Sequence, residues 1–532
     1  MKKTSCCDKI SISAYSSEKT VLRKDTHHAG SKRKALERKD EKAEALKRKI
    51  LNAKDEIRIA GKAYYVSNNG NDENDGKSPE TPWASLTKVN SFALQSGDGM
   101  FFERGGLWRG WINAKEGVTY AAYGKGDKPI FYSWKENLAD PSLWEFYDKE
   151  HNIWKYTDTV LDAGTLVFNE GERHSRKLIP SYNKHGKFVC RDNEQKEFVM
   201  AEEMTQNLDI FCNYDKNLTT VPSKGEDFPI PDMYSKYDPS GELFLRCDEG
   251  NPGEVFDSIE VNERFSLIRV GDRKNVRIDN LCIKYIGCHA ISAAGIRSTG
   301  LCVTNCEIGW IGGSIQTYAG TDPNYPEGTR GSVTRLGNGV EIYGGCDNYT
   351  VSNCYIYQIY DAGITHQMTA SRGVDYLMTN IEYSENLVEH AVYSIEYFLE
   401  IRDESNSYMK GIKMHDNILR YSGYGWGQQR HNYHTPAHIK GWSYENPASD
   451  YEIYNNIFDR AAYRMLHLVA KKPESLPKMY GNTYVQYENN MIGQYGANEE
   501  KEPDILCFDE NAEKTVKEAL GDKDASVIVI KN

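Results

Sequence analysis

The sequence contains no apolar run long enough to cross a membrane, and residues 1–30 contain none long enough for the apolar core of a secretion signal. We therefore expect no membrane partner and a cytoplasmic location. The sequence also has no Cys-x-x-Cys pair, and Cys302 and Cys306 have no second pair at the spacing of a zinc site. On this basis we expect neither a structural metal nor another cofactor.

The twelve cysteines of the chain are better explained as core residues than as disulfide partners. Free cysteine packs as a small apolar side chain, and reduced thiols are typical of a reducing compartment. We expect reduced, buried thiols at the five cysteines that lie in or beside short apolar segments of β type. These are Cys282, Cys302, Cys306, Cys346 and Cys354.

Positive charge is in deficit, since 65 Lys and Arg face 77 Asp and Glu and the formal net charge is −12. An acidic chain is a poor partner for a polyanion, so we do not expect it to bind nucleic acid. Tyrosine, in contrast, is abundant at 36 residues. Aromatic side chains and asparagine suit flat, polar, ring-shaped ligands, although tyrosine is also a common strand residue.

Helical periodicity is scarce between residues 275 and 470, and an Asn-x-hydrophobic phrase recurs there instead. In its clearest copies a short apolar strand follows about ten residues later, as in Asn353-Cys-Tyr-Ile before Gly363-Ile-Thr. A repeat built from short strands and Gly or Asn corners predicts a parallel β-solenoid, an all-β fold in which each repeat is one coil. The phrase begins at Asn280, Asn305, Asn353, Asn386, Asn417 and Asn456.

The register of the coils follows from the aliphatic residues of these strands. Val340 and Ile364 are one coil apart, and Ile291 and Ile395 occupy the equivalent place in the coils before and after. Because side chains alternate along a strand, stacking these residues inward turns the next residue of each strand outward. The predicted outward row is Ser292, Glu341, Thr365 and Glu396.

The remaining parts of the chain differ in composition from these coils. A charged, Ala- and Lys-rich segment at 31–59 predicts an amphipathic helix, which either caps the open end of the solenoid or extends into solvent. We expect an N-terminal helical extension at 1–61, entry coils at 62–139, a β-rich insertion at 140–262, further coils at 263–490 and a tail at 491–532.

Three groups of motifs give the chain a family resemblance. The opening Tyr64-Tyr-Val-Ser through Ser78-Pro-Glu-Thr-Pro-Trp83, the central Gly337-Asn-Gly-Val-Glu-Ile-Tyr343 and Ile359-Tyr-Asp-Ala-Gly-Ile-Thr-His-Gln367 resemble right-handed parallel β-helix proteins of the pectate-lyase-like superfamily. The resemblance covers about residues 62–490. It implies the fold, and it implies a carbohydrate-active protein without choosing among the lyases, hydrolases, epimerases and depolymerases that share this fold.

Carboxylates on the outward row are the candidate catalytic groups. Glu341 and Glu396 lie on the predicted row, and Asp361 lies at the corner that enters the strand between them. Carboxyl groups that lie close together raise one another's proton affinity, so one can act as acid while another acts as base or nucleophile. We assign Asp361 as nucleophile or base, Glu396 as acid and Glu341 as a residue that orients substrate. The competing interpretation is that Asp361 caps its corner and Glu341 only solubilises the sheet.

Basic and aromatic residues near the same strands are candidates for substrate binding. Such groups would hydrogen-bond sugar hydroxyls, neutralise a uronate or stack on a ring. A metal site at His431 and His434 is not favoured, because no carboxylate accompanies them at helical spacing. The binding candidates are His366, His390, Trp426, Arg430, His438 and Lys440.

Three functional classes remain open at this stage. A glycoside hydrolase that uses paired carboxylates in a groove on the β-helix is the leading interpretation. A polysaccharide lyase or epimerase acting on a uronic-acid polymer is the alternative, and only a lyase would bring Ca²⁺ into consideration as a cofactor. The third is a carbohydrate-binding solenoid without catalysis.

Overall fold

The computed structural model describes residues 28–133, 135–182, 188–191, 193–213, 240–318, 333–370, 373–401, 405–430, 435–441, 447–498 and 503–531. The chain divides into two compact units, Met1–Lys42 and Ala43–Asn532, and the following description concerns the second. Among the described residues, no helix is long and apolar enough to span a membrane.

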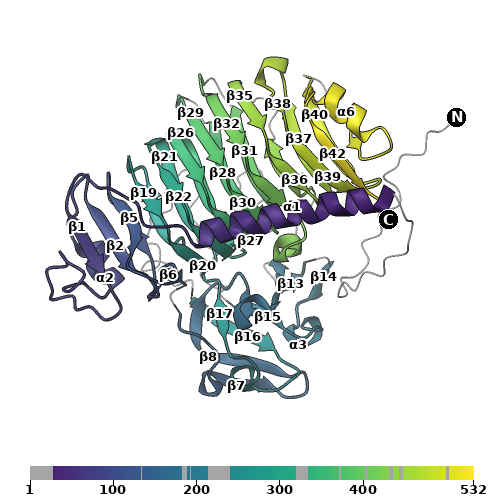
Figure 1. The fold of residues 1–532 in the computed structure, drawn as a ribbon. Coiled ribbons are helices and arrows are strands. Elements are labelled where there is room, and N and C mark those ends of the chain that lie inside the picture. Colours follow the sequence, from purple (N-terminus) through teal and green to yellow (C-terminus); the bar gives the residue numbers. More distant parts are fainter. Residues whose placement is uncertain are drawn as a thin grey trace. The chain divides into compact units, whose positions relative to one another are not determined.

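The larger unit is built on a right-handed parallel β-helix, as the sequence predicts. Successive coils stack in parallel, so that each strand pairs with its equivalents one coil earlier and one coil later. Figure 1 shows these stacked strands running from β1 (Ala63–Val66) towards the C-terminal end of the chain. The strands form three strips, two of which merge into one 19-stranded sheet while the third is a separate 10-stranded sheet.

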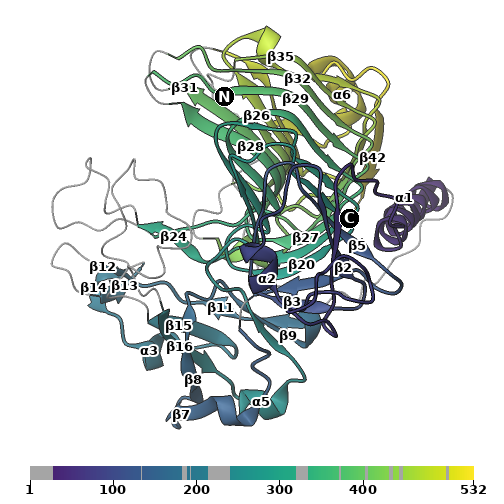
Figure 2. The same ribbon diagram turned by 90° about the vertical axis from the view of Figure 1, so that its left-hand side faces the viewer.

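The first strip carries the candidate site, and Figure 2 shows three of its strands, β26, β28 and β31, side by side. It consists of β4 (Ile112–Asn113), β18 (Ile268–Gly271), β21 (Ile291–Thr299), the start of β26 (Val340–Ser352), β28 (Ala362–Ala370), β31 (Tyr393–Ile401), β34 (Ala437–Gly441), β37 (Arg464–Ala470) and β40 (Met491–Ala497).

The other two strips complete each coil. The second contains β1, β2 (Gly99–Glu103), β5 (Thr119–Tyr123), β19 (Arg277–Asp279), β22 (Cys302–Thr304), the end of β26, β29 (Leu377–Ser384), β32 (Tyr408–His415), β35 (Ala448–Tyr454) and β38 (Lys478–Tyr480). The third contains β3 (Leu107–Arg109), β6 (Ile130–Tyr132), β20 (Cys282–Ile286), β23 (Glu307–Ile311), β27 (Tyr355–Ile359), β30 (Leu387–Glu389), β33 (Ile418–Arg420), β36 (Ile457–Asp459), β39 (Thr483–Tyr487) and β42 (Ser526–Ile530).

The predicted register of the first strip is confirmed. Ile291 pairs with Val340, Val340 with Ile364, and Ile364 with Ile395. All four side chains are fully buried inside the coils. Because this row is fixed inward, the neighbouring residues Glu341 and Glu396 are turned away from the coil interior.

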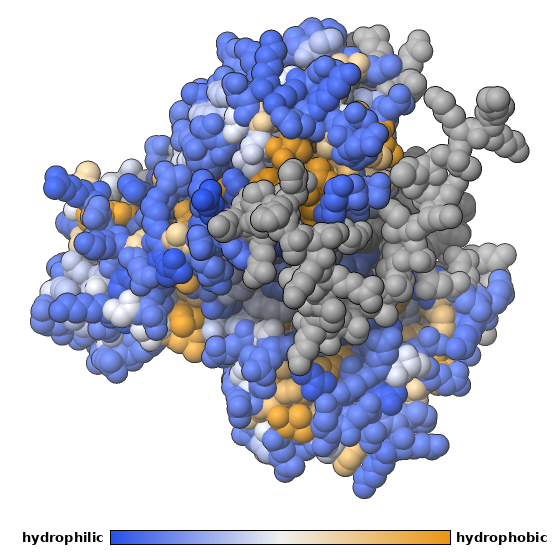
Figure 3. All heavy atoms as spheres, turned by 45° about the vertical axis from the view of Figure 1, so that its right-hand side comes forward, coloured by the Kyte–Doolittle hydropathy of each residue, from blue (hydrophilic) through white to orange (hydrophobic). Residues whose placement is uncertain are grey.

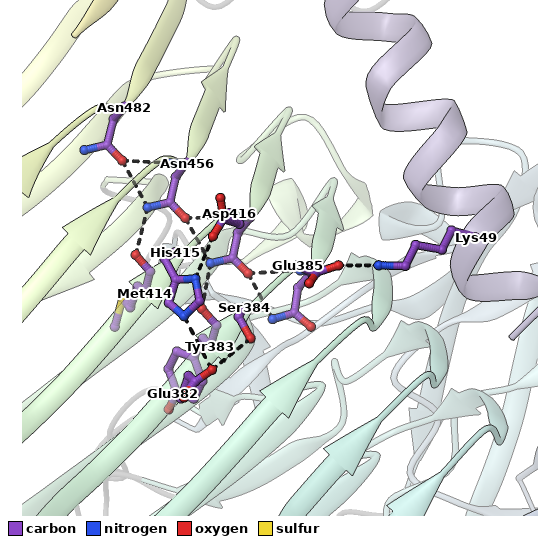
Figure 4. A network of polar contacts seen from close by, with 12 residues as sticks. Lys49, Glu382, Tyr383, Ser384, Glu385, Met414, His415, Asp416, Asn456 and Asn482 are labelled. Carbon is purple, nitrogen blue, oxygen red and sulfur yellow. Dashed lines mark hydrogen bonds and ion pairs between the residues drawn. The ribbon is translucent and has the colours of Figure 1, made fainter. Parts of the chain in front are cut away.

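Asparagines form a hydrogen-bonded ladder at one inner corner of the coils (Figure 4). The side-chain oxygen of Asn456 accepts from the backbone N–H and the side-chain amide of Asn417, at 3.1 and 2.9 Å. The Asn456 amide also donates to the carbonyl of Met414 at 2.9 Å. Asn386 and Asn482 repeat this pattern one coil before and one coil after the central pair. The ladder therefore satisfies corner groups that would otherwise be buried without partners.

The predicted asparagine repeat combines two different positions of the turn. Asn280, Asn305 and Asn353 have φ values of 61°, 55° and 50°, whereas the equivalent left-handed position before Asn386 is Glu385, with φ 53°. The ladder position one residue later is occupied in the early coils by a different set of buried residues. These are Leu281, Cys306 and Cys354. The phrase thus marks the corner correctly, but from Asn386 onwards its asparagine stands one residue later in the turn than in the early coils.

A β-rich insertion separates the entry coils from the central coils. It has its own buried core, which includes Trp144, Tyr156, Phe168 and Leu243. One mixed sheet in the insertion contains β7 (Trp144–Asp148), β8 (Ile153–Leu161), β11 (Arg176–Lys177), β15 (Asp209–Asn213) and β16 (Ser240–Arg246). A second contains β9 (Leu166–Phe168), β10 (Arg173–His174) and β17 (Ile259–Val261), and a third contains β12 (Ser181–Tyr182), β13 (Phe188–Cys190) and β14 (Asn193–Glu197).

The predicted N-terminal helix is α1 (His28–Leu51), which ends before the predicted segment 31–59 does. Its last turns do not cover the open end of a coil. Ala43 and Ile50 pack instead against the outer side of the third strip. The residues covered there are Tyr355, Leu387, Ile418 and Ile457, one from each of four successive coils. This segment therefore shields an apolar stripe along the side of the solenoid.

Helices cover the two ends of the coil core. Leu86 and Val89 of α2 (Leu86–Ser91) pack into the core at the entry coils. Ala512 and Val516 of α6 (Ala512–Ala519) do the same at the last coils. The β-helix continues past the predicted boundary at 490, because β40 and β42 belong to the first and third strips.

The cysteines agree with the sequence-based expectation except at Cys302, whose side chain is half-buried rather than buried. The face seen in Figure 3 is mostly hydrophilic, with apolar residues confined to small patches. Ten cysteines lie among the described residues and all ten are free thiols, whereas Cys6 and Cys7 lie outside them. The five cysteines assigned to the coils are each in or next to a strand.

Candidate active site

Three carboxylates from neighbouring coils lie on or beside the first strip. Glu341 is in β26, Asp361 immediately precedes β28, and Glu396 is in β31. Their exposed fractions are only 8%, 3% and 6%. The side chains of the predicted outward row therefore point away from the coil interior, but other side chains and loops cover them.

Asp361 is the most perturbed of the three carboxyl groups. Burial raises the pKa of Asp361 to about 6, and the negative charges of Glu396 and Glu341 act in the same direction. Arg430 and Lys440 oppose this rise. Arg430 forms an ion pair with Asp361, and its guanidinium lies 5.7 Å from the centre of the Tyr393 ring. Five charged groups thus act on one another at this point of the strip.

Glu396 has its own cationic partner in the next coil. Lys440, which pairs with Glu396 in the strand register, places its ammonium 2.9 Å from the carboxylate. The same ammonium lies 4.1 Å from the centre of the Tyr393 ring. Burial alone would lower the pKa of Lys440, but the charge of Glu396 and the nearby Tyr393 raise it. Lys440 is therefore held in its charged form beside Glu396.

Glu341 is held by a histidine and two amides. His289 Nδ1 lies 2.6 Å from the carboxylate, and Asn338 also donates to it. Burial alone would raise the pKa of Glu341, but the charge of His289 and hydrogen bonds from His289, Asn338 and Gln367 lower it. Asn338 accepts from the backbone N–H of Ala362 at 2.8 Å, next to Asp361. This amide therefore links two of the three carboxylate positions.

Each carboxylate of the site thus has a basic partner: Arg430 for Asp361, Lys440 for Glu396 and His289 for Glu341. Glu341 and Glu396 lie two strands apart, which is about 9–10 Å between their backbones. Side chains that lean towards one another from such positions span the separations of paired acids in glycoside hydrolysis.

Trp426 does not present a ring to the surface. Its exposed fraction is 1%, its indole N–H donates to the carbonyl of Gln358 at 2.8 Å, and its ring packs against Tyr360 at 4.9 Å. It begins the short 3₁₀ helix η5 (Trp426–Gln429), which is followed directly by Arg430. Trp426 therefore holds the turn that carries Arg430 against the coil. We do not include it among the residues that could contact a sugar.

The three predicted binding histidines lie apart from the carboxylates. His366 and His438 are fully buried, and His366 is stacked on Tyr397 inside the coil. Burial lowers the pKa of both to about 3. His390 lies at a corner against Tyr421, where burial and the charge of Arg420 lower its pKa to about 4. Of the predicted binding residues, the structure brings only Arg430 and Lys440 to the carboxylates.

The buried histidines predict that the protein loses stability in acid. In the unfolded chain a histidine titrates near pH 6.5, whereas His366 and His438 titrate near 3 when folded. The unfolded state therefore binds more protons between these values, and each site costs about 1.4 kcal/mol per pH unit as the pH falls. Urea unfolding between pH 7.5 and pH 5 measures this slope.

His366→Phe should make that slope shallower, because it removes one of the groups that protonates only on unfolding. His151, which is partly exposed beside Asp148, supplies the matched control as His151→Gln. An unchanged slope in His366→Phe would show that the buried histidine titrates normally in the folded state.

His289 and Gln367 belong to the site but were not predicted from the sequence. Gln367 is on β28, two residues after the outward Thr365, so continuing the alternation by one step would have found it. His289 lies in the turn before β21, outside every repeat motif. Only the stacking of coils brings it to Glu341.

The described residues contain no group of three or more His, Cys, Asp or Glu side chains arranged to hold a metal ion. His431 and His434, the pair considered for a metal, lie outside the described residues.

The strand pairing defines a parallel β-helix, the fold that the motifs implied. No family model matches the chain. Over 124 residues, 21% of this chain, the sequence is 34% identical to lacto-N-biosidase of Bifidobacterium longum subsp. longum. The matched segment is 8% of the length of that protein.

Solved structures with a similar course of the chain include carbohydrate-related proteins. XylC in complex with xylose matches over 88% of this chain and 83% of its own, at 12% identity and a TM-score of 0.34. The GH136 lacto-N-biosidase of Eubacterium ramulus matches over 88% and 68%, at 10% identity and a TM-score of 0.33. Pectate lyase Pel9A matches over 83% and 73%, at 12% identity and a TM-score of 0.35.

Proposed function

We propose that this protein is a carbohydrate-active enzyme, specifically a glycoside hydrolase whose reaction takes place at Asp361, Glu396 and Glu341. The observation that carries the proposal is the convergence of three nearly buried carboxylates, one of which has a pKa raised to about 6. A carboxyl group with such a pKa is partly protonated near neutral pH and can donate a proton to a leaving oxygen. The local identity to a lacto-N-biosidase supports the same class.

The geometry favours a division of roles that differs from the assignment made on sequence. Asp361, with its raised pKa, is the better proton donor. Glu396, beside the charged Lys440 at 2.9 Å, is placed to act as nucleophile or as the base that activates water. Glu341, bound by His289 and Asn338, is placed to orient the substrate or the side chains next to Glu341.

The lyase alternative receives less support from the charges in the site. A lyase needs cations that neutralise a uronate and a basic group that removes the C5 proton. Here Arg430 and Lys440 each contact a carboxylate of the site, and the pKa of Lys440 is raised rather than lowered. A lysine in that state is a poor proton acceptor at neutral pH.

A product screen tests the proposal directly. Neutral and acidic oligosaccharides are incubated with the enzyme while reducing ends and the ultraviolet absorbance of unsaturated uronates are followed together. Hydrolysis should release reducing ends without new absorbance. Absorbance that rises in step with reducing ends would identify a lyase and reject the proposal.

Tyr343 is the aromatic side chain best placed to contact a sugar ring. It lies on β26 two residues after Glu341, so it shares the outward face at about 7 Å along the strand. Its exposed fraction is 41%, and Phe398 of β31 packs edge-on at 6.5 Å. On its other side the neighbouring strand offers only the small, exposed Ala294. One face of the ring is therefore left open.

Tyr343→Ala should raise KM for the best oligosaccharide of the screen by about tenfold. The reason is that stacking on an aromatic ring contributes on the order of 1 kcal/mol or more. Tyr343→Phe should retain the wild-type KM. Tyr408, which is 40% exposed on β32, provides the control variant Tyr408→Ala. Equal effects of the two alanine variants on KM would argue against a stacking role for Tyr343.

A further inference from the structure

The turn that carries Arg430 is held from two sides. On the coil side, Trp426 of η5 is bound to Gln358 through its backbone N–H at 3.1 Å and its indole N–H at 2.8 Å. A Cβ added to Gly427 would lie 2.8 Å from the carbonyl oxygen of Tyr360, the residue before Asp361. The turn is therefore in close contact with the segment that carries the catalytic carboxyl group.

On the other side, the side chain of Gln429 hydrogen-bonds the insertion, and Trp426 packs in one buried cluster with Val167 of β9. The Gln429 amide donates to the carbonyl of Ser175 at 2.8 Å, and its oxygen accepts from the backbone N–H of Lys177 at 3.2 Å. The Gln429 side chain thus binds one carbonyl and one N–H at the edge of β11 (Arg176–Lys177), as the backbone of a neighbouring strand would. The edge is itself fixed, since Lys177 forms a fully buried ion pair with Asp162.

Asp162 joins this arrangement to the β-helix. Its carboxylate accepts from the backbone N–H of Ile315 at 2.5 Å, and its carbonyl accepts from the Ser314 hydroxyl at 2.8 Å. A continuous set of contacts thus runs from the coil at Ser314, through Asp162 and Lys177, to Gln429. The next residue along the chain is Arg430, whose guanidinium meets Asp361.

We propose that Gln429 is a positioning residue, which uses the β11 edge of the insertion to fix the Arg430 turn and thereby the ion pair between Arg430 and Asp361. The inference rests on the proposed function, in which Asp361 is the proton donor. In this arrangement the insertion influences the acidity of Asp361 through the turn that carries Arg430.

The charges that face Asp361 determine what loosening the turn would do. They are Arg430 and Lys440, which stabilise its ionised form, and Glu396 and Glu341, which oppose it. Only Arg430 depends on the η5 turn for its position. When the turn loses its contact with the insertion, Asp361 should therefore lose part of its cationic partner and become harder to ionise.

The test is an infrared titration of protein labelled with ¹³C-aspartate, in which Asp361→Asn identifies the Asp361 band. Gln429→Met keeps the volume of the side chain and removes its hydrogen bonds to Ser175 and Lys177 together with its contact to His174. It should raise the midpoint of Asp361 by about one pH unit, part of the larger shift given by Arg430→Met. Gln429→Glu, which places an acceptor against the Ser175 carbonyl, should shift it in the same direction.

Gln428 supplies the matched control, because it is the adjacent glutamine and its side chain is exposed. Gln428→Met should leave the midpoint unchanged. A wild-type midpoint in both Gln429 variants, or an equal shift in Gln428→Met, would overturn the inference. Because the titration uses no substrate, it decides the role of Gln429 even where the product screen rejects a hydrolase.

Discussion

Asp361→Asn is expected to lower kcat by about 10²–10⁴-fold, the contribution of a positioned acid or base. The amide keeps the shape of the side chain and can still contact Arg430, but it cannot give a proton to the leaving oxygen. Since Asp361 is nearly buried in a turn that other residues hold in place, the variant should remain folded. Steady-state kinetics on the best substrate of the screen, with a thermal melt of each protein, measures both effects.

The pH profile distinguishes a donor from a base at this position. A donor acts in its protonated form, so with a pKa of about 6 the rate should fall as the pH rises through that value. A base would give the opposite limb, with the rate falling as the pH decreases through 6. The limb near pH 6 should be absent from the residual activity of Asp361→Asn. If the wild-type limb has the opposite sign, the roles assigned to Asp361 and Glu396 must be exchanged.

Asp347 provides the control for the first prediction. It lies on the same long strand as Glu341 but on the second strip, where its carboxylate accepts from Thr379 and Asn380. Asp347→Asn should leave both kcat and the pH profile unchanged. Near-normal activity in Asp361→Asn itself would reject the proposed site.

The placement of the carboxylates was within reach of the sequence because strand alternation is a strict rule. Once Val340 and Ile395 are set inward, Glu341 and Glu396 have only one side left to occupy. The same rule, applied one step further, puts His366 inside the coil with Ile364, two residues before it. That consequence was missed because a histidine beside acidic residues suggests chemistry more readily than packing.

Loops follow no such rule, and there the sequence was a poor guide. Trp426 lies in a connection without register, so nothing in its neighbours indicates that Gln358 and Tyr360 bury its ring. The hydrogen bond between Gln429 and Ser175 of the insertion joins two residues that are 254 positions apart in the chain. Such pairs are determined by how the insertion packs on the coils, which short motifs do not record.

Glu396→Gln is expected to reduce kcat as strongly as Asp361→Asn, by about 10²–10⁴-fold, because it removes the second carboxylate of the pair. The amide retains the size of the side chain beside Lys440. Where Glu396 is the nucleophile, Glu396→Ala should regain activity with azide, which fills the vacated space and attacks the same carbon. In either role azide displaces the leaving oxygen from the opposite face while Asp361 gives that oxygen its proton, so the product should be a glycosyl azide of inverted configuration. A glycosyl azide of retained configuration would show instead that Glu396 is the acid.

The same variant should also change the titration of Asp361, which separates a direct role from loss of structure. The charge of Glu396 helps to raise the pKa of Asp361, so Glu396→Gln should move the limb near pH 6 downward. Glu400, on the same strand and bound by Thr369 at 3.0 Å, gives the control Glu400→Gln. A variant that merely loosened β31 would lower the rate without moving that limb. A lowered rate together with a downward shift therefore requires Glu396 and Asp361 to act as one interacting pair.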